Sequence, residues 1–582
     1  MAPTRWILKA SWQRRLAKQA LNPSGCGAML PDMDGFGGNG PGWKAYLPAL
    51  AWFAVVFIGI PACSPPPAEL VVANGPDVQI LDPQKATSAP DGRVLHALFC
   101  GLTQLNPESL KPEPALAEAF GQERGGRGWW FQLRPNLRWS DGRPLTGEDV
   151  VASWRRLLHP KTGAAYRNWL FPLEGLDPNN LAQQLEQRQD LPGVHLDGLR
   201  LEVRFSIPVP AFAEMCAYHA LMPVPPSLRQ DSPSTQGSWP SSGPYQLQRR
   251  VIRDRIRLSA NPYYWRAPKP EAKSLDFLTV ESQFTALNLF LAGEVHLVAT
   301  DVPALAVPAL LEREEVLRRQ AREHGRQPRT AEFDPVPYWA CYFYRINVTR
   351  TPLQDRKVRQ ALNLAVDRKA LAAMVGARRP PAYSLVPPLI PDYQPPELPR
   401  RNPEKARQLL AEAGFPKGEN FPPIELLYNS AEIHRDVAES LQAQWQEVLG
   451  IEVRLYNQEW KVVLDAQNRL QYDLSRSSWI GDYLDPSTFL EVFRSDSPHN
   501  RCGWEDPEYD RLLDQAQLCE QRQPRLALLQ QAEQRLLQYG PILPLFYYTT
   551  LELVSSDLRG YVRNPRGYVD WAALSLAKSE EP

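Results

Sequence analysis

Helical and strand-like patterns alternate along the C-terminal half of the chain, and this alternation constrains the fold more than any other feature. A helix is predicted from Asn402-Pro403, a cap residue followed by a first-turn proline, to Gly414. A second helix is predicted to end before Gly450, after which residues 451–455 alternate as a strand. Residues 358–366 carry a third helical stripe. Helices that alternate with strands predict α/β lobes.

The N-terminal half of the chain also shows both helical and strand-like patterns of apolar residues. Strands are predicted at 70–73, 130–133 and 201–205, and helices at 93–99 and 148–158. The second of these helices follows Thr146, a favourable N-cap residue. Because a single hydrophobic core stops growing at roughly 250–300 residues, a chain of 582 residues predicts two or three lobes.

Charge and motif content argue against several classes of function. Lys plus Arg and Asp plus Glu both number 65, so the basic excess typical of a nucleic-acid binder is missing. The eight His show no metal-ligand spacing, and we expect neither a metal site nor a cofactor. K-T-G at 161–163 and S-x-x-K at 575–578 match motifs of penicillin-interacting enzymes, but they stand in reverse order and no S-D-N links them. We therefore expect no enzyme.

An apolar run of 16 residues, Ala45–Ile60, fits the hydrophobic region of a signal peptide. The residues after it, up to Cys63, resemble a bacterial lipobox, in which the Cys is lipidated and becomes the mature N-terminus. Residues 1–63 are thus predicted as leader and lipoprotein signal peptide, although Met33 is an alternative start, and residues 64–69 as a proline-rich tether. The alternative is an uncleaved membrane anchor. Either reading places the globular part outside the cytoplasm, on the periplasmic side of the envelope.

Five cysteines remain in the predicted mature domain: Cys100, Cys216, Cys341, Cys502 and Cys519. An odd number allows at most two disulfides. Cys502 and Cys519 are the nearest candidates for a pair, and free buried thiols are an equally good interpretation.

Short motifs occur in a fixed order from residue 81 to residue 510. They are Leu81-Asp82-Pro83, Leu133-Arg134-Pro135, Trp139–Thr146, Ser242–Tyr245, Asn261–Trp265, Val358–Leu362, Trp479–Tyr483 and Pro507–Asp510. Each motif alone has little specificity. In this order they resemble the extracellular solute-binding proteins of the oligopeptide and dipeptide ABC-importer type, family 5, over nearly the whole predicted mature chain.

The resemblance implies an α/β, two-lobed periplasmic-binding-protein type II fold (class C) with an extra subdomain inserted in the first lobe. The implied segments are 70–112, 233–337 and 550–582 for lobe I and the C-terminal tail, 113–232 for the inserted subdomain, and 338–549 for lobe II. It also implies a monomer that closes on a short peptide between its lobes. The loaded protein would dock on an ABC permease pair with its ATPases.

The resemblance assigns one set of ligand contacts to the segment around Trp479. Asp482 matches the aspartate that pairs with the ammonium of the peptide, whereas by itself an Asp at this place is more often a turn or cap residue. Ser478, Trp479 and Ile480 would pair with the ligand backbone. Arg476 would meet the carboxylate of a short peptide, and a surface Arg paired to a nearby acid is an equal alternative. Because residue 480 is Ile, the disulfide that some members form here is absent.

Further contacts are implied elsewhere in the chain. Thr87, Ser88 and Ala89 would form a loop of the opposing lobe with strand-like contacts to the ligand. Tyr166, Tyr338 and Phe343 match positions that line the cleft in relatives, although aromatic residues usually belong to cores. Three interpretations of function stay open: peptide capture, capture of another cargo (an oligosaccharide, a murein peptide or a metal chelate), and a sensor subunit without transport.

Overall fold

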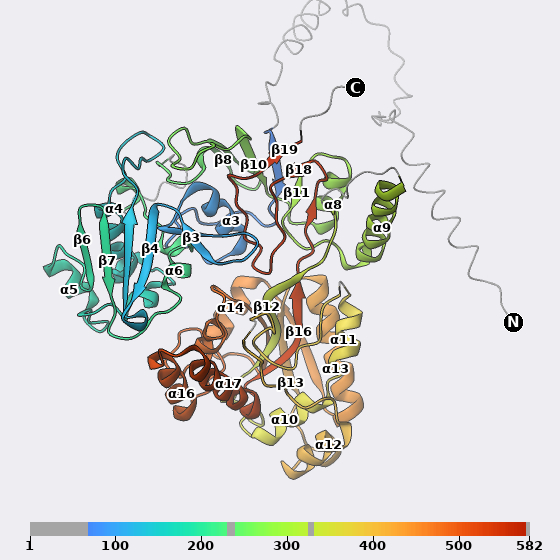
Figure 1. The fold of residues 1–582 in the computed structure, drawn as a ribbon. Coiled ribbons are helices and arrows are strands. Elements are labelled where there is room, and N and C mark those ends of the chain that lie inside the picture. Colours follow the sequence, from blue (N-terminus) through green and yellow to red (C-terminus); the bar gives the residue numbers. More distant parts are fainter. Residues whose placement is uncertain (1–67, 230–238, 324–330, 377, 391, 578–582) are drawn as a thin grey trace, which may run out of the picture. The chain divides into compact units, whose positions relative to one another are not determined.

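The computed structural model describes most of the chain between residues 68 and 577 (Figure 1). The described ranges are 68–229, 239–323, 331–376, 378–390 and 392–577. The predicted leader, the lipidation residue Cys63 and the tether up to residue 67 lie outside them. No helix within these ranges is long and apolar enough to cross a bilayer. Pro67–Pro582 form one compact unit, within which the segment boundaries given above remain a prediction.

A six-stranded sheet, called lobe I here together with the elements that pack on it, is centred on β1 (Leu70–Ala73). All four residues of β1 are buried, and its two neighbours run parallel to it. A strand covered on both faces needs a continuous apolar run, which is why this segment does not alternate. The sheet order is β17 (Leu553–Val554), β11 (Leu297–Val298), β1, β10 (Ser274–Leu278), β9 (Arg255–Ala260) and β8 (Tyr245–Val251).

Helix α3 (Ala89–Leu98) packs into the core of lobe I and begins four residues before the predicted start. Its cap is Ser88, whose Oγ accepts a hydrogen bond from the backbone N–H of Asp91 at 3.2 Å. Pro90 fixes the first turn. The apolar stripe identified in the sequence starts only with the second turn, so the cap and not the stripe marks the true start.

A four-stranded antiparallel sheet forms the insert, named so for the predicted inserted subdomain. Its order is β4 (Ala117–Glu123), β5 (Gly128–Leu133), β7 (Arg200–Arg204) and β6 (Val194–Asp197). Helix α4 (Gly147–Leu158) packs through Trp154, which is fully buried in the core of the insert. The predicted cap is confirmed, since Thr146 precedes α4 and its backbone N–H donates to Asp149 Oδ2 at 3.1 Å.

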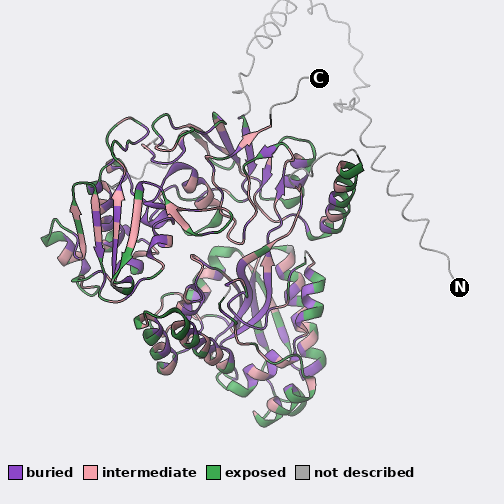
Figure 2. Ribbon diagram, viewed as in Figure 1, coloured by how far each residue is buried: buried purple, intermediate pink, exposed green. Residues whose placement is uncertain are grey.

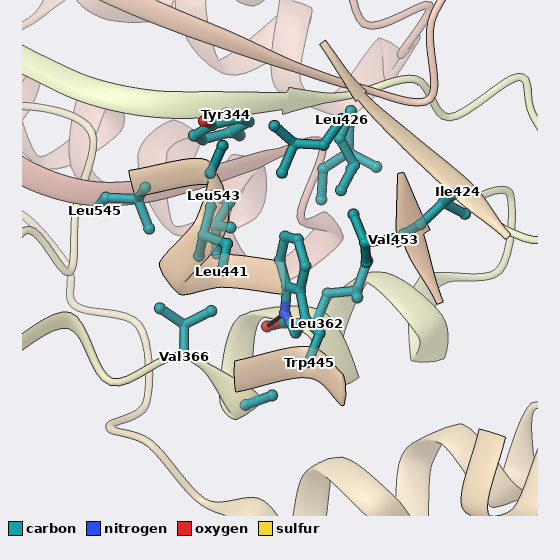
Figure 3. Close-up of a cluster of buried hydrophobic side chains, with 14 of the residues drawn as sticks. Tyr344, Leu362, Val366, Ile424, Leu426, Leu441, Trp445, Val453, Leu543 and Leu545 are labelled. Atoms are coloured by element: carbon teal, nitrogen blue, oxygen red, sulfur yellow. Dashed lines mark hydrogen bonds between the residues drawn. The ribbon is translucent and has the colours of Figure 1, made fainter. Parts of the chain in front are cut away.

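The second lobe, lobe II, contains a five-stranded mixed sheet. Its order is β14 (Val453–Gln458), β13 (Ile424–Asn429), β15 (Leu474–Ile480), β12 (Pro337–Ile346) and β16 (Ile542–Thr549). The three helices predicted in this half are confirmed as α10 (Arg356–Ala365), α12 (Pro403–Glu412) and α13 (Glu432–Leu449). Helix α13 ends where Gly450 adopts a left-handed φ of 72°. Trp445 of α13 is fully buried in the core of lobe II, and its Nε1 donates to Leu362 O of α10 at 3.0 Å (Figure 3).

Each of the remaining longer helices exposes one face to solvent (Figure 2). They are α5 (Leu181–Gln187), α8 (Gln283–Leu291), α9 (Val307–Glu323), α11 (Arg368–Val375), α14 (Trp460–Asn468), α16 (Pro507–Leu518) and α17 (Arg522–Tyr539).

Two neighbouring segments connect lobe I with lobe II. The chain leaves lobe I just before β12 and returns to it just after β16. At this point the backbone N–H of Thr550 donates to Val336 O at 2.9 Å, so the outgoing and returning chains are joined side by side. Two adjacent connections of this kind are the usual architecture of a hinge between lobes.

Candidate functional site

The sheet of lobe II has an open edge along the second half of β15. β13 pairs with β15 only at Leu474 and Ser475, whereas β12 pairs with it as far as Ile480. Among the described residues, no strand therefore lies beside β15 on the β13 side beyond Ser475. A strand edge of this kind presents unpaired N–H and C=O groups to any extended chain that reaches it.

Hydrogen bonds on both sides of β15 identify which residues face the open edge. Asp473 O accepts from Asn347 N–H just after β12, and Gly481 N–H donates to Trp339 O in β12. The backbone N–H and C=O groups of the odd-numbered residues between them therefore point toward β12. On the other side, Arg476 O accepts from Gln467 Nε2 at 3.0 Å. By alternation, the N–H and C=O groups of Ser478 and Ile480 point into the open edge.

A buried cation lies at one end of this edge. Arg476 is only 8% exposed, and its guanidinium donates to Tyr548 Oη at 2.8 Å and lies 4.8 Å from the ring centre of Tyr342. The weaker third contact is to the amide oxygen of Asn429 at 3.5 Å. No carboxylate of the described residues forms an ion pair with Arg476, so this charge is left to attract an anion from outside the protein.

A carboxylate lies at the opposite end of the edge. Asp482 Oδ1 accepts from Tyr166 Oη of the insert at 3.5 Å, and Tyr218 Oη donates in turn to Tyr166 Oη at 3.0 Å. Burial raises the pKa of Asp482 to about 7, and the nearby charge of Arg566 opposes this only in part. The guanidinium of Arg566 donates to the backbone carbonyl of Asp482 and not to its carboxylate. The carboxylate therefore lacks a full counter-ion.

A cavity of about 220 Å³ lies beside Asp482, on the face of β15 to which Trp479 points. Its walls come from the insert, through Trp169 and Met215, and from lobe II, through Trp479 and His499. The rings of Trp479 and His499 lie 5.2 Å apart, and the indole N–H of Trp479 has no partner among the described residues. The wall of this cavity mixes aromatic and apolar residues with polar and charged ones, among them Glu491 and Arg525.

Two further cavities share the tyrosines Tyr338 and Tyr548. One, of about 170 Å³, is bounded on the lobe I side by Arg93, Asp301 and Glu552. The other, of about 830 Å³, lies in lobe II, and prolines and tyrosines form much of its wall. Because Tyr548 also holds Arg476, these spaces lie at the cationic end of the open edge.

Comparison with known proteins identifies the chain. The model of the bacterial extracellular solute-binding proteins, family 5, matches residues 111–501. The chain belongs to this family. The periplasmic oligopeptide-binding protein OppA of Salmonella typhimurium is 33% identical over 504 residues, which cover 84% of this chain and 89% of OppA. The probable deoxycholate-binding periplasmic protein YgiS of Escherichia coli is 33% identical over 509 residues and covers 85% of this chain and 91% of YgiS.

Solved structures confirm the fold of this family 5 protein. The murein tripeptide binding protein MppA of Escherichia coli matches with a TM-score of 0.78 at 28% identity, over 88% of this chain and 99% of MppA. The complex of Haemophilus influenzae OppA with RPPGFSPFR matches with a TM-score of 0.74 at 27% identity, over 88% of this chain and all of that one. The predicted α/β periplasmic-binding-protein type II fold is thus correct.

The structure of this family 5 protein brings some predicted site residues together and separates others. Asp482 and Tyr166 are in contact, and Tyr338 lines both tyrosine-walled cavities. The prediction that Phe343 lines the cleft is wrong for the structure as it stands. Its side chain is fully buried and packs on Phe493 in the core of lobe II. It lies on the same face of the sheet as Trp479, but Phe493 and the surrounding core cover it there.

The loop of the opposing lobe is part of a helix start. Thr87, Ser88 and Ala89 are all exposed; Ser88 has an extended backbone and caps α3, and Ala89 is the first residue of that helix. The backbone carbonyl of Ser88 accepts from Gly92 N–H at 2.9 Å and so belongs to the first turn of the helix. The role of these three residues in ligand binding remains a prediction.

Sequence reasoning missed three residues of the site: Arg566, Tyr548 and Asp301. They reach the site from segments far from Trp479 in the chain, and their importance lies only in spatial contacts. No local motif signals such contacts. The described cysteines form no disulfide, because Cys100, Cys216, Cys341, Cys502 and Cys519 are all free thiols.

Proposed function

We propose that this chain is the substrate-binding protein of an ABC importer and that it captures short peptides as an added strand on the open edge of β15. The observation that carries the proposal is the edge itself, with an unpaired guanidinium at one end and an unpaired carboxylate at the other. An extended peptide has the complementary groups: a carboxylate, an ammonium, and between them a row of backbone donors and acceptors. The names of relatives such as OppA support this cargo class.

The positions of the two charges set the direction and length of the ligand. The ammonium lies at Asp482 and the carboxylate near Arg476, so the peptide runs antiparallel to β15. Its first residue then pairs with Ile480 and its third with Ser478. Arg476 lies two residues, or about 7 Å, beyond Ser478, within the reach of its long side chain. The favoured ligand is therefore a tripeptide.

Strand alternation also assigns the side chains of the ligand. Its second residue lies opposite Trp479, and directly opposite residues share a face of the sheet. The second side chain therefore enters the cavity of about 220 Å³ beside Trp479 and His499. A cavity of ~150 Å³ already holds a benzene ring, so the volume here admits a bulky side chain, and the polar part of the wall can also receive a polar group.

Enclosure by both lobes and the insert completes the proposed role. Tyr166 of the insert and Arg566 of the C-terminal segment both reach the residue that binds the ammonium. Closure around the ligand would then create the form that a permease recognises. In this proposal the protein binds without catalysis, acts as a monomer, and is held at the periplasmic side of the envelope by a lipid on Cys63.

A murein tripeptide is the second candidate cargo. The three-residue spacing favours it, because MppA, whose structure this chain resembles, is described as a murein tripeptide binding protein. A murein tripeptide offers charges to the same two ends of the edge, so the first experiment includes it.

The test is a thermal-unfolding screen of the purified protein against di- to pentapeptides, their N-acetylated forms, a murein tripeptide and oligosaccharides. A ligand at about 100 times its Kd stabilises the folded state by roughly 2.7 kcal/mol. Free tripeptides should raise the melting temperature most, and N-acetylation should remove the effect. Stabilisation by a sugar, with none by any free peptide, would overturn the peptide assignment and leave the family intact.

A further inference from the structure

An ion pair crosses from one lobe to the other at the cationic end of the open edge. Arg379 follows α11 in lobe II, and its side chain is only 2% exposed. Its Nη2 lies 3.3 Å from Oδ2 of Asp301, which follows β11 in lobe I. Because a buried guanidinium without a carboxylate is costly, this partner from the opposite lobe stabilises the buried charge.

Arg379 and Arg476 surround the same group of aromatic side chains. The guanidinium carbon of Arg379 lies 5.7 Å from the ring centre of Phe546 and 5.9 Å from that of Tyr548. Arg476 donates to the hydroxyl of Tyr548. Burial and then the charges of both arginines lower the pKa of His434, which stays neutral. This end of the cleft therefore holds two buried cations, and only one of them is paired with an acid.

The two arginines at the adjoining cavity of about 170 Å³ already have partners in the protein. Arg93 on its wall donates to Asn74 Oδ1 at 2.7 Å and to Asn74 O at 2.8 Å, and Asp301 holds Arg379. A ligand that extends into this cavity would have to compete with these partners for either guanidinium. Its carboxylate would also approach two protein carboxylates, Asp301 and Glu552, in a space from which the ligand excludes water.

We propose that Asp301 limits the ligand to three residues, because it occupies Arg379, the cation that the carboxylate of a fourth residue would need. This inference rests on the proposed function. A tripeptide ends at Arg476, whose charge is free. A tetrapeptide extends about 3.4 Å further, and its carboxylate must displace Asp301 from Arg379 or remain buried without a partner. Asp301 thus sets specificity for ligand length without contacting the tripeptide.

The test compares two probes, trialanine and tetra-alanine, by isothermal titration calorimetry on the full chain. Wild-type protein should bind tetra-alanine at least tenfold more weakly than trialanine. In Asp301→Asn this ratio should fall to within about threefold, because Arg379 becomes free. The readout is the ratio of the two dissociation constants. Loss of a contact between the lobes weakens closure for both peptides alike, so this effect cancels in the ratio. In the double variant with Arg379→Gln, tetra-alanine binding should weaken again.

The matched control is Asp254→Asn, since Asp254 is also an aspartate of lobe I in an ion pair with an arginine, Arg255 at 3.0 Å, but lies on the turn between β8 and β9. In Asp254→Asn the ratio of the tetra-alanine and trialanine dissociation constants should equal that of the wild type. If trialanine binds and the ratio in Asp301→Asn is unchanged, the length mechanism is wrong and peptide capture stands. If wild-type protein binds neither peptide, the proposed function fails, and the inference fails with it.

Discussion

Replacing Asp482 with asparagine should stabilise the empty protein and at the same time abolish its affinity for peptides. Burial raises the pKa of this carboxyl from 3.8 to about 7. The folded protein therefore binds the Asp482 proton more tightly than the unfolded chain does. The stability that this proton contributes is fully present below about pH 4 and is lost as the pH rises through 7. The Asp482→Asn variant carries an uncharged amide here at any pH and escapes the loss.

The magnitude follows from the distance between the pH and the pKa. pH 5 lies two units below the pKa of the folded carboxyl. At this pH the carboxyl of Asp482 is protonated in the folded protein and largely ionised in the unfolded chain. At 1.36 kcal/mol per unit, this group stabilises the wild type by up to about 3 kcal/mol more at pH 5 than at pH 8. The partial exposure of Asp482 to its cavity makes this an upper limit. The unfolding free energy of the Asp482→Asn variant lacks this pH-dependent contribution altogether.

The two assays are urea unfolding and peptide titration between pH 5 and 7.5. Since the ammonium binds only the ionised carboxylate, wild-type affinity should fall on the order of a hundredfold from pH 7.5 to pH 5, tenfold per unit below the pKa. Glu491 lines the same cavity, and burial raises its pKa to about 7, so its titration contributes a pH dependence that both proteins share. The effect of Asp482 is therefore the difference between the two pH profiles. Affinity of Asp482→Asn should be weak and should show only the shared pH dependence. Parallel pH profiles for the two proteins would refute the argument.

A control with the opposite sign lies three residues away. Burial alone would raise the pKa of Asp485, but the two hydrogen bonds and the charge of Arg525 lower it. Its ionised form therefore contributes stability above pH 4, and this stability is lost as the pH falls through the lowered pKa. Asp485→Asn should destabilise the protein at pH 8, where Asp482→Asn stabilises it. A stabilising effect of both substitutions would indicate a general response to lost charge.

Three further predictions concern packing and the free thiols. A Cβ at Gly481 would lie 1.9 Å from the indole nitrogen of Trp339, so Gly481→Ala should displace the segment that carries the carboxylate and weaken peptide binding at least tenfold by calorimetry. The control Gly92→Ala, where the nearest side-chain atoms to a Cβ lie 3.7 Å away, should leave affinity unchanged. Trp445→Ala should cost about 3–5 kcal/mol in urea unfolding, because the ring is fully buried; a cost below 1 kcal/mol would contradict the packing described. Among the described cysteines, a native-state alkylating agent should modify Cys519 first, as located by peptide mass mapping, since the other four are buried.

Local patterns in the sequence predict the elements of the fold, and long-range contacts determine the site. Asn402 and Gly450 are recognisable as helix ends because caps and left-handed glycines act within one turn. Asp482 is found only through its motif, and its raised pKa depends on burial by the insert. The ion pair between Asp301 and Arg379 joins residues 78 positions apart, so neither side chain shows a local signal.

The open edge of β15 has a second consequence, for the behaviour of the protein when no ligand is present. An unpaired strand edge can pair with the edge of another molecule and start aggregation. Here the exposed stretch is limited to Ser478–Ile480, too short for the six- or seven-residue segments that build stable zippers. Beyond it lie an arginine on one side and a carboxylate on the other. A second protein chain has no free termini at this spacing, so the features that select a short peptide also protect the protein from its own copies.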